Sequence, residues 1–171
     1  TGEELWRVDG GSETTCGTPT FDGERVYASG GQPEHETWAV SADGSGTIVW
    51  SAEDYVYEPS LLVANGLVFA VTDDGIAICW DALSGEERWK ERLEGKFSAS
   101  PLLCGENVYV TNDRGLTFIY EATGEEYREI AANPLGTDAY ATPVICDSRI
   151  YFRVGDDSSG TRQERLVCIG E

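Results

Sequence analysis

The 171-residue sequence predicts an all-β fold, namely a β-propeller of about four antiparallel blades with four strands each. Three observations support this prediction. The chain repeats itself with a period of about 40 residues, Gly-bearing turns separate its short apolar runs, and its central strands are apolar on both faces. A sheet with one wet face would alternate apolar and polar residues, whereas blades stacked around an axis bury both faces.

The stretch from Pro59 to Trp89 shows the repeat most clearly. Turns at Asn65-Gly66, Asp74-Gly75 and Ser84-Gly85 divide it into short β-rich runs. Asn and Gly tolerate the positive φ angles that tight hairpin turns require. The stretch is therefore predicted to be a four-stranded antiparallel meander.

Three registers of equivalent residues define four repeat units. Prolines recur at spacings of 40, 42 and 42, apolar pairs of the Val-Tyr type recur at 42, 40 and 42, and a Gly is followed four residues later by Trp in three places. The residues are Pro19, Pro59, Pro101 and Pro143; Val26-Tyr27, Val68-Phe69, Val108-Tyr109 and Ile150-Tyr151; and Gly2, Gly46 and Gly85 with their tryptophans. Agreement among three registers indicates a genuine repeat.

The units are predicted at about residues 15–50, 51–89, 90–128 and 129–171, within a single propeller segment that covers residues 1–171. Unit four ends before any Gly-x-x-x-Trp strand, and Thr1–Trp6 supplies such a strand at the other terminus. We therefore expect a strand over residues 1–8 to close unit four. The alternative is that the chain begins inside the preceding unit of a longer array.

The repeated tryptophans Trp6, Trp50 and Trp89 are predicted to dock neighbouring blades together. Each follows a turn at a fixed position, where a large ring can fill the space between blades and its N–H can find a carbonyl. The alternative interpretation is an aromatic platform for a sugar or a quinone. By the same count Arg128 holds the Trp position of unit three, so the pattern lapses there.

Charge and hydropathy restrict the class of partner. The net charge is −19, from 31 acidic and 12 basic residues, and such a surface repels nucleic acid and anionic membranes. A solvated acidic coat is the favoured interpretation, and a cationic partner or a calcium-rich setting is the functional alternative. No apolar run is long enough to span a bilayer, so no membrane insertion is predicted. No segment of the given sequence has the basic start and apolar middle of a signal peptide, and a start at Thr1 within a turn leads us to expect a piece of a longer protein.

Five cysteines cannot all form disulfides with one another, because the count is odd. Four of them, Cys79, Cys104, Cys146 and Cys168, stand at repeat-equivalent positions, which stacked sheets hold about 10 Å apart. We expect these four to be small buried apolar side chains. The position of Cys16 is not predicted by the repeat.

The sequence resembles the pyrroloquinoline-quinone-like (PQQ-like) propeller repeats. These repeats combine a Ser-Pro step, a Val-Tyr strand, an Asp-Gly hairpin, an Asp-x-x-(Thr/Ser)-Gly turn and a terminal Trp, and the last part is matched by Asp81–Trp89. The resemblance covers nearly the whole chain. It looks most like the bacterial, planctomycete-type secreted members, which often end in a strand such as Leu166–Gly170. Such proteins usually have about eight blades, so the resemblance implies a C-terminal half-ring and a periplasmic or secreted location.

The resemblance also raises the question of a quinone cofactor. Quinoprotein dehydrogenases of this fold bind the quinone and a calcium ion with an Asp base, Asn and Glu ligands, a stacking Trp and, in some members, adjacent cysteines. No Cys-Cys pair occurs here, and the other residues cannot be matched one by one. Other relatives include the outer-membrane assembly lipoprotein and sensor domains of kinases. We therefore predict no catalytic residue and no cofactor, and leave any cofactor-binding residues unassigned.

Several residues that suggest chemistry are explained by the fold. His35 is the only His, so it lacks the partner ligands of a zinc site, and it gives the Ser and Cys side chains no credible triad. The acidic turns Asp73-Asp74-Gly75 and Asp156-Asp157-Ser158 lack the distal Glu of a calcium loop. Turn chemistry accounts for them, and no metal site is predicted.

The favoured function is a non-catalytic extracytoplasmic propeller that acts as a scaffold or recognition domain for a protein or another ligand. The alternative is a fragment of a PQQ- and calcium-dependent quinoprotein dehydrogenase. A third hypothesis is a binder of carbohydrate or peptidoglycan that uses Trp80 or Tyr side chains. Four blades from a larger ring would expose the apolar outer faces of the first and last blades. We therefore expect a homodimer that completes the ring.

Overall fold

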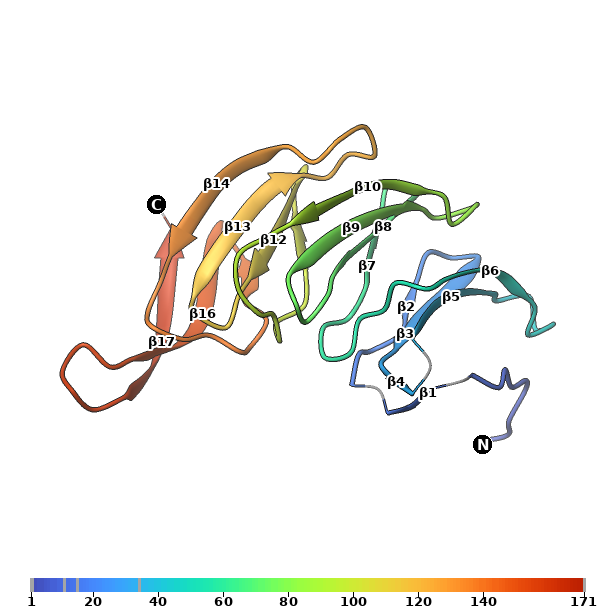
Figure 1. The fold of residues 1–171 in the computed structure, drawn as a ribbon, viewed down its shortest axis with the longest axis horizontal. Helices are drawn as coiled ribbons and strands as arrows, with labels where there is room; N and C mark the ends of the chain where they lie inside the picture. The colour runs from blue at the N-terminus through green and yellow to red at the C-terminus, as the bar shows by residue number, and fades with distance from the viewer. Residues whose placement is uncertain (1, 11, 15, 34, 171) are drawn as a thin grey trace.

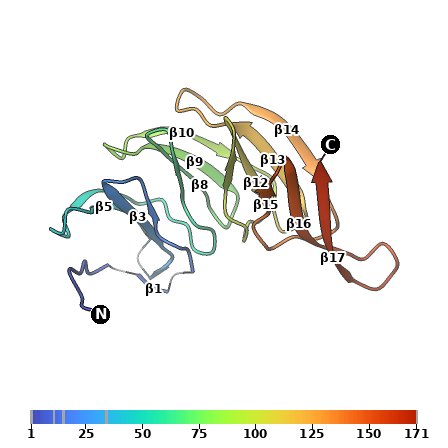
Figure 2. The same ribbon diagram turned by 180° about the vertical axis from the view of Figure 1, so that it is seen from behind.

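The computed structural model describes residues 2–10, 12–14, 16–33 and 35–170. Its sheets stand side by side along an arc, with the N-terminus at one end and the C-terminus at the other (Figure 1). The view from behind shows the same separation of the two termini (Figure 2). None of the described residues forms a helix with the length and apolarity that crossing a bilayer requires.

Three sheets have four strands, and each strand pairs antiparallel with the next. Sheet one consists of β2 (Thr20–Phe21), β3 (Arg25–Gly30), β5 (Glu36–Ser41) and β6 (Ile48–Ala52). Sheet two consists of β7 (Leu62–Ala64), β8 (Leu67–Val71), β9 (Ile76–Asp81) and β10 (Glu87–Arg92). Sheet three consists of β11 (Leu102–Cys104), β12 (Asn107–Thr111), β13 (Leu116–Glu121) and β14 (Glu129–Pro134).

Sheet four has three strands, which are β15 (Val144–Cys146), β16 (Arg149–Asp156) and β17 (Gln163–Gly170). A separate pair joins β1 (Ser12–Thr14) to β4 (Gln32–Pro33). The predicted all-β propeller fold is confirmed. The expected strand over residues 1–8 is not formed in this structure, because the described residues 2–8 lie outside any strand and sheet four ends at β17.

The central strands of sheet two are buried on both faces, as the apolar pattern predicts. On one face, Val68 and Trp80 pack against Tyr27 and Trp50 of sheet one. On the other face, residues such as Phe69 pack against sheet three. Burial on both sides stabilises the fold by about 25 cal/mol for each Å² of apolar surface that is removed from water.

Hairpin turns follow the predicted chemistry. Asn65 and Gly66 both have positive φ, at 54° and 73°, in the turn between β7 and β8. The equivalent turn of sheet four is made by Asp147 and Ser148, with φ of 49° and 59°. A left-handed conformation at Ser148 is strained, because it brings the Ser Cβ too close to the backbone, a contact that Gly avoids.

A row of hydroxyl groups joins the beginnings of the four units. The backbone N–H of Thr18 donates to Oγ of Ser60 at 2.9 Å, that of Ser60 donates to Oγ of Ser100 at 2.8 Å, and that of Ser100 donates to Oγ1 of Thr142 at 2.9 Å. The spacing of these residues is 42, 40 and 42. Ser60 is the residue equivalent to Thr18 in this row. Pro19 follows Thr18, whereas Pro59 precedes Ser60. Pro59 therefore lies two residues before the position equivalent to Pro19.

Candidate binding cleft between the sheets

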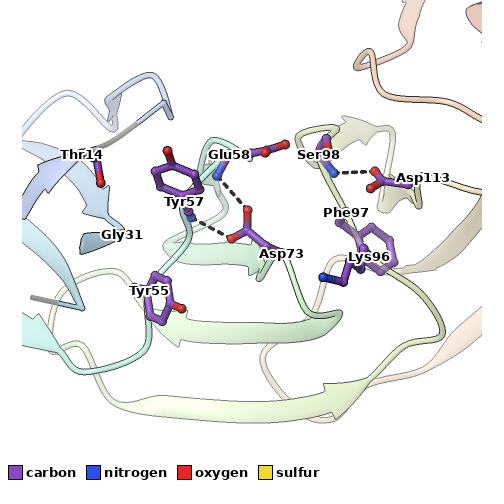
Figure 3. A pocket seen from close by; sticks show the side chains of 10 residues that line it. All are labelled: Thr14, Gly31, Tyr55, Tyr57, Glu58, Asp73, Lys96, Phe97, Ser98 and Asp113. Carbon is purple, nitrogen blue, oxygen red and sulfur yellow. Dashed lines mark hydrogen bonds between the residues drawn. The ribbon is translucent and has the colours of Figure 1, made fainter. Parts of the chain in front are cut away.

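A cleft of about 410 Å³ opens where the units meet, and we call it the hairpin cleft. It is bordered by the β8–β9 and β12–β13 hairpins and by the segments that lead into sheets two and three (Figure 3). The residues that line it are Thr14, Gly31, Tyr55, Tyr57, Glu58, Asp73, Lys96, Phe97, Ser98 and Asp113.

Asp73 lies at the centre of the hairpin cleft and holds two chain segments (Figure 3). Its Oδ2 accepts the N–H of Tyr57 at 2.9 Å, and its Oδ1 accepts the N–H of Glu58 at 3.0 Å. Its backbone carbonyl accepts the N–H of Phe97 at 3.0 Å. Both carboxylate oxygens of Asp73 therefore stabilise the loop that enters sheet two.

Asp113 repeats this arrangement one unit later. Its Oδ1 accepts the N–H of Ser98 at 3.0 Å, and its carbonyl accepts the N–H of Ala139 at 3.2 Å. The two hairpin aspartates thus connect each sheet to the segment that begins its own unit and to the segment that begins the next unit. The sequence predicts Asp73 as a turn residue, whereas its carboxylate also holds residues 57 and 58 of another segment.

The remaining side chains of the cleft include aromatic rings, the basic Lys96 and the exposed acidic Glu58. Tyr55 is half-buried and stacks on the ring of His35, with 3.8 Å between ring centroids. Gly31 lies against the Tyr57 ring so closely that it leaves no room for a Cβ. Lys96 is exposed and extends from the opposite side of the cleft toward Asp73 (Figure 3). Tyr55, Tyr57, Glu58 and Lys96 are therefore the groups that can contact a ligand.

Cys16, which the repeat did not place, lies beside this cleft. Its N–H donates to the carbonyl of Tyr57 at 3.2 Å, and contact with its thiol raises the pKa of the Tyr57 hydroxyl. The hydroxyl of Tyr57 is thus held beside the Cys16 thiol at the edge of the cleft.

Two of the repeated tryptophans reach across sheet boundaries. Trp50 of sheet one is buried and donates its Nε1–H to the carbonyl of Ala82 at 3.0 Å. Trp89 of sheet two donates its Nε1–H to the carbonyl of Thr123 at 2.7 Å. Gly85 packs against the Trp50 ring so closely that a Cβ would come within 2.6 Å of a ring atom. The Gly-x-x-x-Trp register thus pairs each ring with the Gly turn of the next unit.

Trp6 is 36% exposed and lies near Gly46, where a Cβ would be 3.8 Å from its ring.

In sheet three, Ala131 pairs with Ile119, as Trp89 pairs with Cys79 in sheet two. The expectation that Arg128 holds the Trp position was wrong, because β14 is displaced along its neighbour. Arg128 is exposed and forms ion pairs with Glu121 and Glu126.

Comparison with known proteins identifies the family. Residues 36–128, more than half of the chain, match the family profile described as outer membrane protein assembly factor BamB, whose members are built from PQQ-like repeats. The chain belongs to this PQQ-like repeat family. The outer membrane protein assembly factor BamB of Burkholderia pseudomallei (strain K96243) is 28% identical over 134 residues. This match covers 74% of the chain and 34% of the relative, so the chain spans about a third of that protein.

Two solved structures show the same PQQ-like fold. BamB from Moraxella catarrhalis superposes with a TM-score of 0.66 at 16% identity, over 81% of this chain and 40% of that chain. A europium-containing methanol dehydrogenase superposes with a TM-score of 0.73 at 16% identity, over 88% of this chain and 37% of that chain. At this identity the likeness establishes the fold alone.

We tested whether this PQQ-like chain offers ligands for a calcium ion or a quinone. Among the described residues, no group of three or more His, Cys, Asp or Glu side chains converges on a point where a metal could bind. Asp73 has both oxygens committed to backbone N–H groups. Asp156 accepts the N–H of Ser158 and pairs with Arg165. The carboxylates of Asp73 and Asp156 are thus already held by donors of the protein itself.

Several residues singled out in the sequence are now placed. His35 is exposed and stacked on Tyr55. Trp80 is 1% exposed in the core between sheets one and two, so it cannot be the carbohydrate platform of the third hypothesis. Cys79 is buried as expected, Cys104 is only half-buried, and Cys146 and Cys168 are exposed. The expectation of burial was wrong for the last two, because none of the described residues packs against the face of sheet four that carries them.

Proposed function

We propose that the chain is a non-catalytic, extracytoplasmic propeller segment that binds a protein partner, and that the hairpin cleft receives a basic, extended segment of that partner. The observation that carries this proposal is the engagement of Asp73 and Asp113 by loop N–H groups. The carboxylates of Asp73 and Asp113 therefore hold the loops in place and are not available as catalytic groups. The lining that remains, with Tyr55, Tyr57 and Lys96, is suited to contact rather than to reaction.

Charge supports a basic partner. Glu58, Asp73 and Asp113 give the cleft three carboxylates against the single ammonium group of Lys96. The chain as a whole carries a net charge of −19, which attracts a cationic segment over a distance and speeds its association. Tyr rings add large contact area at a small cost in conformational entropy.

The relatives support a protein-binding role and an extracytoplasmic location. The Burkholderia pseudomallei protein is named as an outer membrane protein assembly factor. Carried over to this chain, that name favours a periplasmic or secreted protein whose partner is another protein. The chain spans only 34% of that relative, so the partner and location of the whole protein belong to this proposal.

Binding of short, unstructured fluorescent peptides with increasing Lys and Arg content tests the proposal. Affinity should rise with basic content and fall with salt. Tyr55→Ala and Glu58→Gln should each weaken binding by about tenfold. Glu106→Gln, on an exposed turn of sheet three outside the cleft, makes the same charge change and should leave affinity unaltered. Equal weakening by Glu106→Gln, or no peptide binding at all, would contradict the proposal.

The competing function is a fragment of a PQQ- and calcium-dependent dehydrogenase. Its support is the fold shared with the europium-containing methanol dehydrogenase. Titration of the protein with PQQ in the presence of calcium distinguishes the two functions. A stoichiometric shift of the quinone spectrum, together with dye-linked oxidation of an alcohol or sugar, would establish the dehydrogenase and refute the non-catalytic proposal.

A further inference from the structure

A second hollow of about 260 Å³ adjoins the hairpin cleft, and we call it the outer hollow. The two share Tyr55 and Asp73, so together they form one groove beside the β8–β9 hairpin. The outer hollow is lined by residues between positions 53 and 92, all of them inside the stretch 36–128 that matches the family profile. Its shape therefore depends on sheet two and on the segment that leads into it, both of which lie well inside the chain.

Two carboxylates of the outer hollow are already held by this chain. Asp73 accepts the backbone N–H groups of Tyr57 and Glu58. Nζ of Lys90 donates to Oδ2 of Asp54 at 2.7 Å. These two carboxylates therefore hold the walls of the groove in place.

Two other carboxylates, those of Glu53 and Asp74, remain open to a ligand. No described residue forms a hydrogen bond or an ion pair with the Glu53 side chain, which is exposed. The Asp74 side chain is 78% exposed, and its one ion pair in the described part of the chain is long, with 4.0 Å between Oδ1 and Nζ of Lys96. A cationic side chain that enters the outer hollow therefore meets two carboxylates that lack a close partner.

Among the described residues that line the outer hollow, Arg92 alone is cationic, and it is anchored. Its Nη1 donates to the backbone carbonyl of Asp74 at 3.1 Å. The four carboxylates of the lining outnumber this guanidinium, and Lys90 neutralises only Asp54. The outer hollow thus keeps an excess of negative charge, which favours a cationic ligand over an anionic one.

Tyr55 forms a wall that the hairpin cleft and the outer hollow share. Its ring is half-buried and is stacked on His35, with an angle of 21° between the two planes. His35 lines neither the cleft nor the outer hollow, so it supports the ring from the side away from them. In the hairpin cleft, Tyr55 and Lys96 lie on opposite sides of Asp73 (Figure 3). The stacking fixes the orientation of the Tyr55 ring, and the face of a Tyr ring attracts a cation.

We infer that the outer hollow is a subsite for an arginine side chain of the basic partner segment, with the guanidinium stacked on Tyr55 and paired with Glu53. The inference rests on the proposed function, because it places the main chain of that segment in the hairpin cleft. A guanidinium is planar, so one face can lie on an aromatic ring while the N–H groups at its edge bind a carboxylate. The ammonium group of lysine is a compact, strongly hydrated point charge and cannot do both. The groove should therefore select arginine over lysine at one position of the segment.

Two unstructured fluorescent peptides of equal length and charge test the subsite. In one of them serine alternates with lysine, and in the other serine alternates with arginine. The arginine peptide should bind about fivefold more tightly. A lysine peptide with a single central arginine should recover most of this gain, because only one side chain enters the outer hollow. A central citrulline, which has the planar shape of arginine without its charge, should give no gain.

Variants of the wall show whether Tyr55 and Glu53 produce the selectivity. Tyr55→Leu removes the ring and Glu53→Gln removes the charge, and each should reduce the preference for arginine to less than about twofold. Tyr55→Phe keeps an aromatic ring and should keep the preference. Glu106→Gln, an exposed control outside both the cleft and the outer hollow, should keep it as well.

The outcomes separate this inference from the proposed function. If neither peptide binds, the proposed function fails and the arginine subsite fails with it. If the lysine peptide binds and Glu58→Gln weakens that binding, the proposed function stands. In that case, equal affinity for the two peptides would overturn the arginine subsite alone. A preference for arginine that survives both Tyr55→Leu and Glu53→Gln would overturn it as well.

Discussion

The backbone N–H of Ser60 donates to the hydroxyl of Ser100 at 2.8 Å and so links the segments that begin units two and three. Replacement of Ser100 by Ala leaves this partly buried N–H without an acceptor, and we expect a loss of about 1–2 kcal/mol in the free energy of unfolding. Ser100→Thr keeps the hydroxyl and should cost much less. Urea denaturation followed by tryptophan fluorescence measures both variants, and an equal loss for Ala and Thr would show that the hydroxyl is not responsible.

The indole N–H of Trp89 gives a second prediction. Trp89→Phe keeps an aromatic ring between sheets two and three but removes the 2.7 Å hydrogen bond to the carbonyl of Thr123. The lost bond and the smaller ring should together cost about 1–3 kcal/mol. Trp6→Phe is the matched control, because Trp6 has an exposed ring. Thermal unfolding at a concentration where the protein is monomeric should rank Trp89→Phe well below Trp6→Phe.

The sequence predicted those features that depend on local chemistry or on the repeat. Asn65 and Gly66 tolerate positive φ, so the turn between β7 and β8 could be placed, and the fixed spacing of Trp50 and Trp89 gave their position after a turn. The hydroxyl row could not be predicted, because Pro59 precedes Ser60 and displaces the proline register by two residues. An alignment on the prolines does not bring Ser60 into line with Thr18, Ser100 and Thr142, so the hydrogen bonds between them could not be predicted.

The cleft was less predictable than the fold. Asp73 binds residues 57 and 58 of the chain, and nothing in the local pattern distinguishes such a carboxylate from one that only stabilises its own turn. The exposure of Cys146 and Cys168 was also missed, because the repeat predicts burial wherever a neighbouring sheet is assumed. Contacts between distant segments and the presence of a neighbour are tertiary facts that repeat spacing does not contain.

Strain at Ser148 leads to a third prediction. Its φ is 59°, in the left-handed region, while the corresponding residue in the turn of sheet two is Gly66. Ser148→Gly should stabilise the protein by about 1 kcal/mol, because the penalty of Cβ in this conformation disappears. Gly66→Ser is the reverse change at a position with open space around it, and it should destabilise by a similar amount. Denaturant midpoints that shift in the same direction for both variants would contradict this explanation.

Asp81 gives a pH-dependent prediction. The Arg88 guanidinium donates to its Oδ2 at 2.7 Å and the Ser84 N–H donates to its Oδ1 at 2.9 Å, and together they lower the pKa of Asp81 from 3.8 to about 2. A carboxyl group whose pKa is lower in the folded state binds protons more readily when unfolded. Its contribution to stability is therefore present above pH of about 4 and is lost as the pH falls toward 2.

Asp81→Asn removes that ionisation while keeping the side chain's size. The variant should be less stable than wild type at neutral pH, and the difference should narrow as the pH falls from 3.8 toward about 2. Glu125→Gln, at an exposed position, serves as the charge-matched control. Urea midpoints measured across this pH range test the prediction. A difference between Asp81→Asn and wild type that stays constant from neutral pH to pH 2 would show that ionised Asp81 does not stabilise the turn.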